Sequence, residues 1–505
     1  MEFSKYQLHI FDETVNGNGN VVVEALAGSA KSTSLVESLK RLNEKYSFIV
    51  IAFNTKIVEE LKQKVSKNVL ALNKNRHINT IHSYGLKCLG KTFKNISVEN
   101  DKTETLISKT LGKKIKDKDV IYQLIEVVRK AKLTMSSSKD EIVELIDRFE
   151  IDLFDYPSDD FVNHVQFLLN LSKKYNTIVD MEDMIWLPNV IPVDTIQYDY
   201  VFVDEAQDMF KAGRNLIRKA LNKNGRLFAF LDENQAIMSW CGTEIDSVKY
   251  FKSEFNAKTL PLPICYRCPK KVIEQAQKFV PEIQAAPNAK EGFVASIKES
   301  EMFKLVKPGN VIISRYNAPL LSIAMKLVSE RKPCIIQGRD IGNNLISMIK
   351  QSKAKSIDGF LKWLEKWKNK ECARLARRKK DATWVTDRYT CLTTLCSSNN
   401  SLKEMKDSIS KLFVDVDDSQ RILLSSIHKF KGMENDTVFV LAYTLRSSPT
   451  EERNLSYVGV TRSKNSLYYV YKDKKKTAGI DDLMKNLDSE NMTFHEMNEI
   501  FGVQN

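Results

Sequence analysis

The chain has 505 residues and a formal net charge of +13, with 43% hydrophobic and 28% charged residues. No run of about 18 apolar residues occurs, which excludes a membrane-spanning helix, and the N-terminal MEFSKYQLHIFDE does not resemble a signal peptide. The basic charge favours a polyanionic partner such as nucleic acid; the alternative is a proteome rich in Lys and Asn. The composition is typical of globular proteins, and the length predicts about two to four domains.

Eight cysteines are scattered without a disulfide framework, which indicates a reducing compartment. Cys265 and Cys268 have the spacing of half a zinc site, but no second close pair completes it, so no structural metal is expected there. The expected location is cytoplasmic or associated with the nucleoid, and a viral or phage source is compatible with the sequence.

The first elements alternate between strand and helix. Strands are predicted at 21–25 and 48–52, and a helix is predicted near 57–65, which favours a parallel α/β sheet. From residue 85 to about residue 192 the pattern becomes helical, with helical spacing over 120–132 and 139–149. Short apolar runs at 200–203 and 227–231 then return to buried strands.

A Pro-marked connector at 260–264 precedes a second α/β region. Its strands are predicted at 311–314, 334–336, 422–425, 438–442 and 467–471. The predicted domains are 1–84 with 193–258, a helical insertion at 85–192, a second α/β domain at 259–346 with 420–476, a small basic insertion at 347–419, and a tail at 477–505.

The stretch Val21–Thr33, VVVEALAGSAKST, predicts a phosphate-binding loop. Three β-branched residues lead into a turn of small residues, then Lys31 and Ser32, then an apolar-periodic helix. Loop N–H groups and the helix dipole face an anion, Lys reaches the β/γ-phosphates, and the Ser hydroxyl holds Mg²⁺. Ala25 and Ala30 stand where the strict pattern has glycines, and Ala30 matters more because glycine lets the backbone approach a phosphate closely.

Asp204 and Glu205 follow an apolar strand in YDYVFVDEAQD. At the carboxyl end of a parallel strand they lie at the edge where α/β sheets bind ligands. The first carboxylate suits Mg²⁺, and the second suits the orientation of an attacking water. A solvated acidic turn is the alternative, which the preceding phosphate loop disfavours.

Taken together, the motifs resemble those of the UvrD/Rep/PcrA-type superfamily 1 helicases, in the family's order over most of residues 5–470. The stretches that carry the resemblance, besides those above, are FSKYQLHIFDE around Gln7, AFNTKIVEEL (Ala52–Leu61), NTIHSYG (Asn79–Gly85), VDMEDMIWLP (Val179–Pro188), LDENQAIMSW (Leu231–Trp240), CYRCP (Cys265–Pro269, similar to NYRS), SRYNAPL (Ser314–Leu320), SSIHKFKGMEND (Ser425–Asp436) and EERNLSYVGVTRSK (Glu451–Lys464).

The resemblance implies a fold of two RecA-like P-loop domains with parallel sheets, each carrying an inserted and mainly helical subdomain. It implies catalytic roles for Lys31, Asp204, Glu205, Gln235, Arg267 and Arg462. It implies ATP contacts for Gln7, Ala27, Gly28, Ser29, Ala30, Lys31, Ser32, Thr33, Tyr266, Gly432 and Glu434, and Mg²⁺ ligands at Ser32 and Asp204. It implies nucleic-acid contacts for Phe53, Asn54, Thr80, His82, Trp240 and His428.

Several of these positions have a structural alternative. Phe53 and Trp240 suit base stacking but could pack in the core, and a single histidine is often only a hydrogen-bonded structural residue. The chain departs from the family at Met238, where a ring is usual, at Cys241, where an Arg usually links nucleotide to DNA, and at Thr33, where some members carry an Arg. The absence of Arg at position 241 predicts weaker coupling of ATP hydrolysis to DNA.

Residues 350–380 carry 12 Lys or Arg against 3 Asp or Glu. Phe360, Trp363, Leu364 and Trp367 share one helical face within it. A small domain with an aromatic core and a solvated basic face is the favoured interpretation, and a surface that binds duplex or phosphate backbone is the alternative.

The sequence thus predicts an ATP-dependent DNA helicase or translocase, 3′ to 5′ if it follows its family, acting on single strands and on junctions of single and double strands. The alternatives are an RNA-directed motor of the same fold and a nucleic-acid clamp that has lost turnover. No nuclease signature follows the motor motifs.

Overall fold

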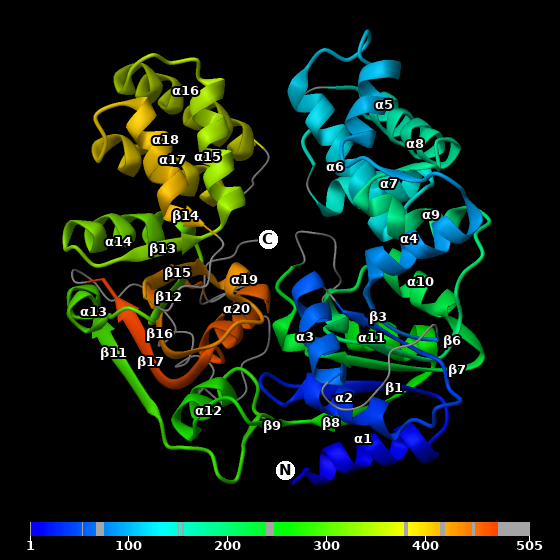
Figure 1. Ribbon diagram of the computed structural model, residues 1–505. Coiled ribbons are helices and arrows are strands. Elements are labelled where there is room, and N and C mark those ends of the chain that lie inside the picture. The colour runs from blue at the N-terminus through cyan, green and yellow to red at the C-terminus, as the bar shows by residue number, and fades with distance from the viewer. Residues whose placement is uncertain are drawn as a thin grey trace. The chain divides into compact units, whose positions relative to one another are not determined.

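The computed structural model describes residues 2–52, 54–66, 75–149, 151–153, 156–238, 247–377, 382–414, 420–446 and 450–472. The chain divides into two compact units, Met1–Pro263 and Ile264–Asn505. Each unit is built on one parallel β-sheet flanked by helices, as the ribbon shows (Figure 1). This confirms the predicted α/β class with two RecA-like parallel sheets.

The sheet of the first unit has six strands, all parallel to their neighbours. In spatial order they are β3 (Arg76–Thr80), β2 (Phe48–Ala52), β6 (Tyr198–Val203), β7 (Leu221–Leu231), β1 (Asn20–Ala25) and β8 (Ala257–Leu262). The predicted strands at 21–25, 48–52, 200–203 and 227–231 are β1, β2, β6 and β7, which occupy the centre of the sheet.

Alternate residues of these central strands are buried on opposite faces. Val22 belongs to one hydrophobic core with α4 (Ile81–Thr92), α10 (Lys211–Ala220) and α11 (Ser247–Phe255), whereas Val21 and Val23 belong to the other. That second core contains α1 (Lys5–Asn16), α2 (Lys31–Arg41) and α3 (Thr55–Ser66). Because both faces are covered, the strands are continuously apolar, as parallel strands usually are.

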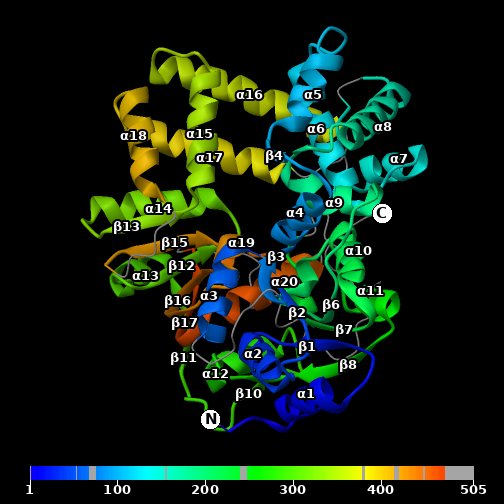
Figure 2. The same ribbon diagram turned by 45° about the vertical axis from the view of Figure 1, so that its right-hand side comes forward.

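The helical insertion of the first unit contains α5 (Lys102–Thr110), α6 (Lys118–Thr134), α7 (Lys139–Arg148), α8 (Ser158–Lys174) and α9 (Met181–Val190), together with the short strands β4 (Ser97–Val98) and β5 (Ile178–Val179). These helices form a hydrophobic core of their own and a group beyond α4 in Figures 1 and 2. The predicted helices at 120–132 and 139–149 are α6 and α7.

Helix α9 contacts both the other helices of this insertion and helix α4 beside the sheet. Asp180, which caps the helix, and Asp183 in its first turn are buried against two lysines. Lys132 Nζ lies 2.6 Å from Asp180 and 2.8 Å from Asp183, and Lys102 Nζ lies 2.5 Å from Asp183. On its other side α9 packs against α4, where a Cβ added to Gly85 would lie 1.9 Å from the Met184 carbonyl oxygen. The stretches 79–85 and 179–188 are therefore in direct contact, and glycine is required at the crossing.

The second unit has a parallel sheet of seven strands. In spatial order they are β11 (Phe293–Lys298), β17 (Ser463–Tyr471), β16 (Asn435–Leu441), β12 (Val311–Ser314), β15 (Ile422–Ser426), β13 (Cys334–Gln337) and β14 (Phe413–Val414). Helices α12 (Lys270–Gln277), α13 (Glu299–Leu305), α14 (Asn317–Ser329), α19 (Ile427–Phe430) and α20 (Thr450–Val460) accompany it, and β9 (Ile264–Cys265) pairs separately with β10 (Gln284–Ala285).

Its inserted helices are α15 (Arg339–Gln351), α16 (Ile357–Arg377), α17 (Thr383–Ser397) and α18 (Leu402–Leu412). They share one hydrophobic core with one face of the sheet, unlike the first insertion. Phe360 and Leu364 are fully buried in that core, and Trp363 and Trp367 pack against it, which agrees with the aromatic-core interpretation.

Two predicted boundaries need correction. Residues 260–264, predicted as a connector, lie largely in β8, so the sheet of the first unit ends at Leu262 and not at residue 258. The helices of the second insertion begin at Arg339, before the predicted residue 347. The predicted tail, 477–505, lies outside the described residues.

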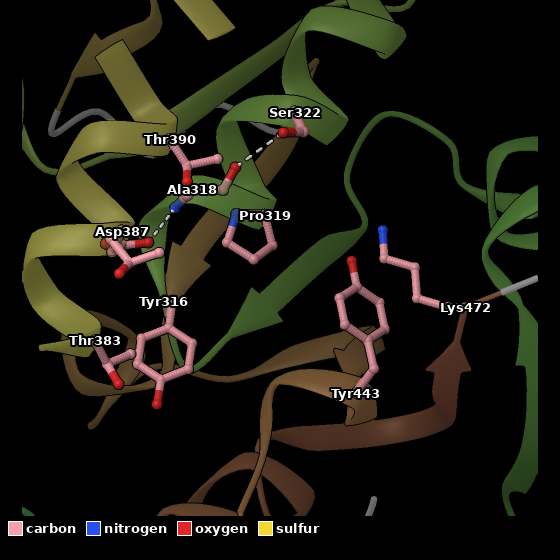
Figure 3. A pocket seen from close by; sticks show the side chains of 10 residues that line it. Tyr316, Ala318, Pro319, Ser322, Thr383, Asp387, Thr390, Tyr443 and Lys472 are labelled. Atoms are coloured by element: carbon pink, nitrogen blue, oxygen red, sulfur yellow. Dashed lines mark hydrogen bonds between the residues drawn. The ribbon is translucent and has the colours of Figure 1, made fainter. Parts of the chain in front are cut away.

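A cavity of about 320 Å³ opens where α14 meets α17. It is lined by Tyr316, Ala318, Pro319, Ser322, Thr383, Thr386, Asp387, Thr390, Tyr443 and Lys472. Asp387 reaches from α17 to accept the N–H of Ala318 at 2.7 Å, at the start of α14 (Figure 3). Among the described residues, none of those predicted for the nucleotide or nucleic-acid site lines this cavity.

Candidate nucleotide and nucleic-acid site

The predicted phosphate loop follows the carboxyl end of β1 and runs directly into α2. Gly28 and Ala30 have positive φ values, 67° and 63°, so that Ala30 takes the left-handed conformation that glycine favours. Ser29 is buried, and its hydroxyl has no hydrogen-bond partner within the described part of the chain. A polar turn at a helix N-terminus with such a hydroxyl is suited to bind an anion.

Lys31 and Ser32 begin α2 and meet the two carboxylates that follow β6. The Lys31 ammonium lies 3.1 Å from Glu205 Oε1, and the Ser32 hydroxyl donates to Asp204 Oδ2 at 3.3 Å. Glu205 has a φ of 53°, again left-handed, as residues at functional sites often are. The sequence placed these four residues on two separate segments, and the fold brings them together.

Burial controls the charges in this cluster. Burial alone would lower the pKa of Lys31. The negative charges of Glu205, Asp232 and Asp204 have a larger combined effect in the opposite direction, so the pKa of Lys31 is raised. Burial, and then the neighbouring Glu205, raise the pKa of Asp204 to about 6, against the opposing effect of Lys31. Burial also raises the pKa of Asp232. A divalent cation and polyphosphate together would complement this arrangement of one cation and several carboxylates.

A chain of hydrogen bonds links this cluster to Gln235. Gln207 donates its side-chain N–H to Glu205, and its Oε1 accepts the Asp232 N–H at 3.2 Å. Gln235 then donates to Asp232 Oδ2 at 2.6 Å. Gln207 and Asp232 were not among the predicted site residues; their position directly after β6 and β7 is the signal that could have identified them.

Gln7 lies beside the first turn of α2. Its side chain closes a capping box with Ser4 at the start of α1, and its Nε2 donates to the Ser34 hydroxyl at 3.2 Å. The predicted contact with adenine is untested by these bonds and stays a prediction. Ala27 is buried in the loop, and Thr33 lies in the first turn of α2, on the same segment.

The predicted nucleic-acid residues of this unit lie at the same carboxyl edge. Asn54 follows β2 and caps α3, accepting the Ile57 N–H at 2.9 Å, and Thr80 ends β3 and caps α4 by accepting the Ser83 N–H at 3.1 Å. Burial, and then the charge of Arg129, lower the pKa of His82 in α4, which favours its neutral form. Phe53, Trp240 and Cys241 lie outside the described residues, whereas Met238 is described and partly buried.

The predicted ATP residues of the second unit lie at the amino edge of its sheet. Arg462 precedes β17 and donates to the carbonyl oxygens of Val458, at 2.9 Å, and Met433, at 3.3 Å. Arg267 pairs with Glu434 and donates to the Thr461 carbonyl oxygen at 3.4 Å. The structure thus brings together residues from 265–269, 432–436 and 461–462.

Two further predicted residues accompany these arginines. Tyr266 precedes Arg267, and 44% of its surface is exposed, so its ring can be reached by a ligand. Gly432 has a φ of 85°, and an added Cβ there would meet nothing within 4 Å, so the left-handed backbone rather than crowding explains the glycine.

His428 lies apart from these arginines, in α19 beyond the carboxyl end of β15. Burial, and then the charges of Arg315 and Lys431, lower its pKa to about 4, so the imidazole is neutral near pH 7. In the second unit the predicted nucleotide and nucleic-acid residues therefore occupy opposite edges of the sheet.

The Ser32 hydroxyl and the Asp204 carboxylate bring two oxygen atoms together, a donor set that suits Mg²⁺. The described residues hold no group of three or more His, Cys, Asp or Glu side chains placed around an ion. This does not weigh against Mg²⁺, because that ion is usually bound through one or two protein oxygens together with phosphates and water.

Two family models match the chain. One describes the UvrD/REP helicase N-terminal domain and covers residues 10–256, and the other describes the UvrD-like helicase C-terminal domain and covers residues 421–470. The chain belongs to the UvrD/Rep/PcrA-type family of superfamily 1 helicases. This confirms the resemblance found in the sequence.

Curated relatives match at modest identity. The ATP-dependent DNA helicase Rep of Buchnera aphidicola is 24% identical over 319 residues, which cover 58% of this chain and 46% of the relative. The ATP-dependent DNA helicase PcrA of Staphylococcus epidermidis is 25% identical over 294 residues, covering 52% of this chain and 38% of the relative. The chain therefore spans less than half the length of these relatives. No described helix is long and apolar enough to cross a membrane.

Proposed function

We propose that this chain is an ATP-dependent DNA helicase or translocase that moves 3′ to 5′ along single-stranded DNA and acts at junctions of single and double strands. The observation that carries the proposal is the convergence of Lys31, Ser32, Asp204 and Glu205 at the carboxyl edge of one parallel sheet. Membership of the UvrD/Rep/PcrA-type family supports the choice of ATP and DNA.

Each residue of the cluster has a role in phosphoryl transfer, which depends mainly on positioning and charge neutralisation. Lys31 would bind the β/γ-phosphates, and Ser32 with Asp204 would hold Mg²⁺, which when bound supplies further neutralisation of phosphate charge. Glu205 would orient the attacking water and accept its proton. A phosphate that draws Lys31 away from Glu205 would also release that carboxylate for the water.

The arginines of the second unit would stabilise charge that develops on the transferring phosphoryl group, with Tyr266 stacking on adenine and Glu434 and Gly432 near the ribose and phosphates. The residues predicted to act on one nucleotide come from two compact units, so we propose that hydrolysis couples the motions of these units. That motion is the inferred translocation step.

Gln235 would report the state of the nucleotide. Its bond to Asp232 continues through Gln207 to Glu205, so a change at the γ-phosphate would alter the segment after Gln235. Trp240 lies in that segment and Phe53 follows β2; we propose that both stack on bases, with Asn54, Thr80, His82 and His428 contacting the strand.

The primary test measures ATP hydrolysis by the purified chain without nucleic acid, with single-stranded DNA, and with RNA of the same sequence. We expect DNA to stimulate hydrolysis, and more strongly than RNA. Stronger stimulation by RNA would favour the RNA-directed motor. Binding of DNA without any ATP hydrolysis would favour a nucleic-acid clamp, in which Ala30 prevents hydrolysis.

Direction is tested with two partial duplexes that differ only in the polarity of the single-stranded tail. The 3′-tailed duplex should be opened in preference, and K31A should open neither. A preference for the 5′-tailed duplex would contradict the proposed polarity.

A further inference from the structure

Cys265 and Cys268 enclose Tyr266 and Arg267 between the end of β9 and the start of α12. The stretch resembles the NYRS motif of the family, but both of its outer residues are cysteine in this chain. The proposed function uses the two enclosed residues and leaves the two thiols without a role. Both thiols are buried, with 0% and 2% of their residue surfaces exposed.

The two cysteines are hydrogen-bonded to each other. The Cys268 backbone N–H donates to Cys265 Sγ at 3.4 Å, across the short turn between the two residues. The Cys268 thiol donates to the Thr461 carbonyl oxygen at 3.5 Å. Arg267 donates to that same oxygen at 3.4 Å, and Arg462 is the next residue along the chain.

The surroundings favour a thiolate on Cys265. The Cys268 thiol has one proton, which can be donated to the Thr461 carbonyl oxygen or to Cys265 Sγ. When it is donated to Cys265, this bond, together with the backbone N–H groups of Cys268 and Arg267 and the Arg267 charge, lowers the pKa of Cys265 to about 7 against the effect of burial. The same bond and burial raise the pKa of Cys268. A thiolate beside a protonated thiol in a Cys-x-x-Cys turn before a helix is the arrangement of thiol–disulfide exchange sites.

We propose that Cys265 and Cys268 form a reversible disulfide that regulates the adjacent arginines, with hydrogen peroxide as the oxidant. The Cys265 thiolate attacks one peroxide oxygen, which breaks the O–O bond and gives a sulfenic acid and hydroxide. The Cys268 thiol then displaces the sulfenic oxygen as water and forms the S–S bond. Overall the two thiols lose two hydrogens, and peroxide is reduced to two waters.

A small oxidant is required because both sulfur atoms are buried. A reducing compartment would return the pair to thiols, so the disulfide would be a transient response to oxidation and not a structural bond. On oxidation the Thr461 carbonyl loses the Cys268 donor, and the turn that holds Arg267 is covalently restrained. We expect both arginines to be displaced from the positions that hydrolysis requires.

The disulfide can be detected without any assay of activity. Trypsin cleaves after Arg267 and thus separates the two cysteines, so peptides that carry them stay joined only when the disulfide is present. The full chain is treated with hydrogen peroxide under native conditions, alkylated, digested and analysed by mass spectrometry. Joined peptides that dithiothreitol separates are expected; alkylated, separate peptides would overturn the proposal.

The regulatory effect rests on the proposed function and is measured as ATP hydrolysis on the same samples. We expect peroxide to lower kcat about tenfold or more, because loss of a transition-state arginine is costly, and dithiothreitol to restore it. C265S should lose the response to peroxide because it lacks the attacking thiolate, whereas C334S, which changes another buried thiol of the same unit, should keep it.

The outcomes separate the two proposals. If the reduced chain hydrolyses no ATP but its peptides become joined, the proposed function fails and the disulfide site stands. If the disulfide forms and kcat is unchanged, the regulatory role is wrong. If C265S is inhibited as strongly as the unmodified chain, inhibition comes from another thiol, and the role of this pair is likewise overturned.

Discussion

The predicted nucleotide residues of the two units lie at opposite edges of their sheets. In the first unit Lys31, Asp204 and Glu205 lie at the carboxyl edge, where α2 presents its N-terminus to the phosphate loop. In the second unit Arg267 and Arg462 lie at the amino edge, where Arg462 donates to carbonyl oxygens at the end of α20 and before β16.

The difference follows from the direction of the helix dipole. A helix N-terminus presents N–H groups and attracts anions, whereas a helix C-terminus presents carbonyl oxygens and attracts cations. The first unit therefore has an edge that favours an anion such as phosphate, and the second holds two cations that we propose to act on the same nucleotide. The rule that ligands bind at the carboxyl edge of an α/β sheet identifies only the first of these two places.

The largest expected effects come from the carboxyl edge of the first unit. K31A and E205Q should each lower kcat by about 1,000-fold or more, because one removes a phosphate ligand and the other the group that positions water. Nucleotide binding, measured by calorimetry, should weaken in K31A and persist in E205Q. E59Q, a change to an exposed carboxylate on α3, is the matched control. Full hydrolysis by E205Q would remove Glu205 from its proposed role.

A smaller but still large effect is expected at the amino edge of the second unit. R267K keeps a positive charge but loses the planar fork of the guanidinium, so kcat should fall about 100-fold with little change in nucleotide affinity. K270A, which changes an exposed lysine on the neighbouring helix, should behave as the unmodified chain. If R267K loses as much nucleotide affinity as kcat, Arg267 binds ATP before the reaction and not only in the transition state. The proposed difference in role between the two edges would then be wrong.

The two edges should also differ in their dependence on pH. Asp204 must be ionised to hold Mg²⁺, and its pKa is raised to about 6, so a proton competes with the ion below that pH. Mg²⁺-dependent nucleotide binding should weaken about tenfold for each pH unit below 6, while the arginines stay charged throughout.

The raised pKa of Asp204 also predicts its effect on stability. The folded chain holds the proton of Asp204 more tightly than the unfolded chain does, so this residue's contribution to stability falls as pH rises from about 4 to 6. D204N should therefore gain in thermal stability relative to the unmodified chain at pH 8 and lose that gain at low pH. An unchanged difference between the two proteins across this range would contradict the assigned pKa.

The smallest expected effect concerns the backbone of the phosphate loop. Ala30 takes a φ of 63°, which costs an alanine about 1 kcal/mol relative to glycine. A30G should therefore raise the melting temperature by about 2–4 °C. A25G, at the buried carboxyl end of β1, should lower it. If A30G also raises stimulation by DNA, the alanine limits phosphate binding as well as stability.

The sequence by itself determined the central strands and the residues that follow them. Strands β1, β2, β6, β7, β12 and β15 are buried on both faces, so each is a short apolar run that ends in polar residues. This is why Lys31, Asp204 and Glu205 could be predicted to lie at one edge of the sheet before the fold was known. The resemblance of ordered motifs then added the arginines, which no apolar pattern marks.

Edge strands were decided only by the tertiary structure. Strands β3, β8 and β11 each have one neighbour, and their sequences lack the apolar run of a central strand. Pro261 is the reason that residues 260–264 were predicted to be a connector. A proline is tolerated in β8 because an edge strand need not donate every backbone N–H to a neighbouring strand.

Contacts between distant segments likewise required the fold. The bond of Gln207 to Asp232, the contact of Gly85 with Met184 and the bond of Cys268 to Thr461 each join segments whose spacing in the sequence carries no signal. Hydrophobic periodicity reports which side of one element is buried, and only the packing of elements decides which polar groups meet.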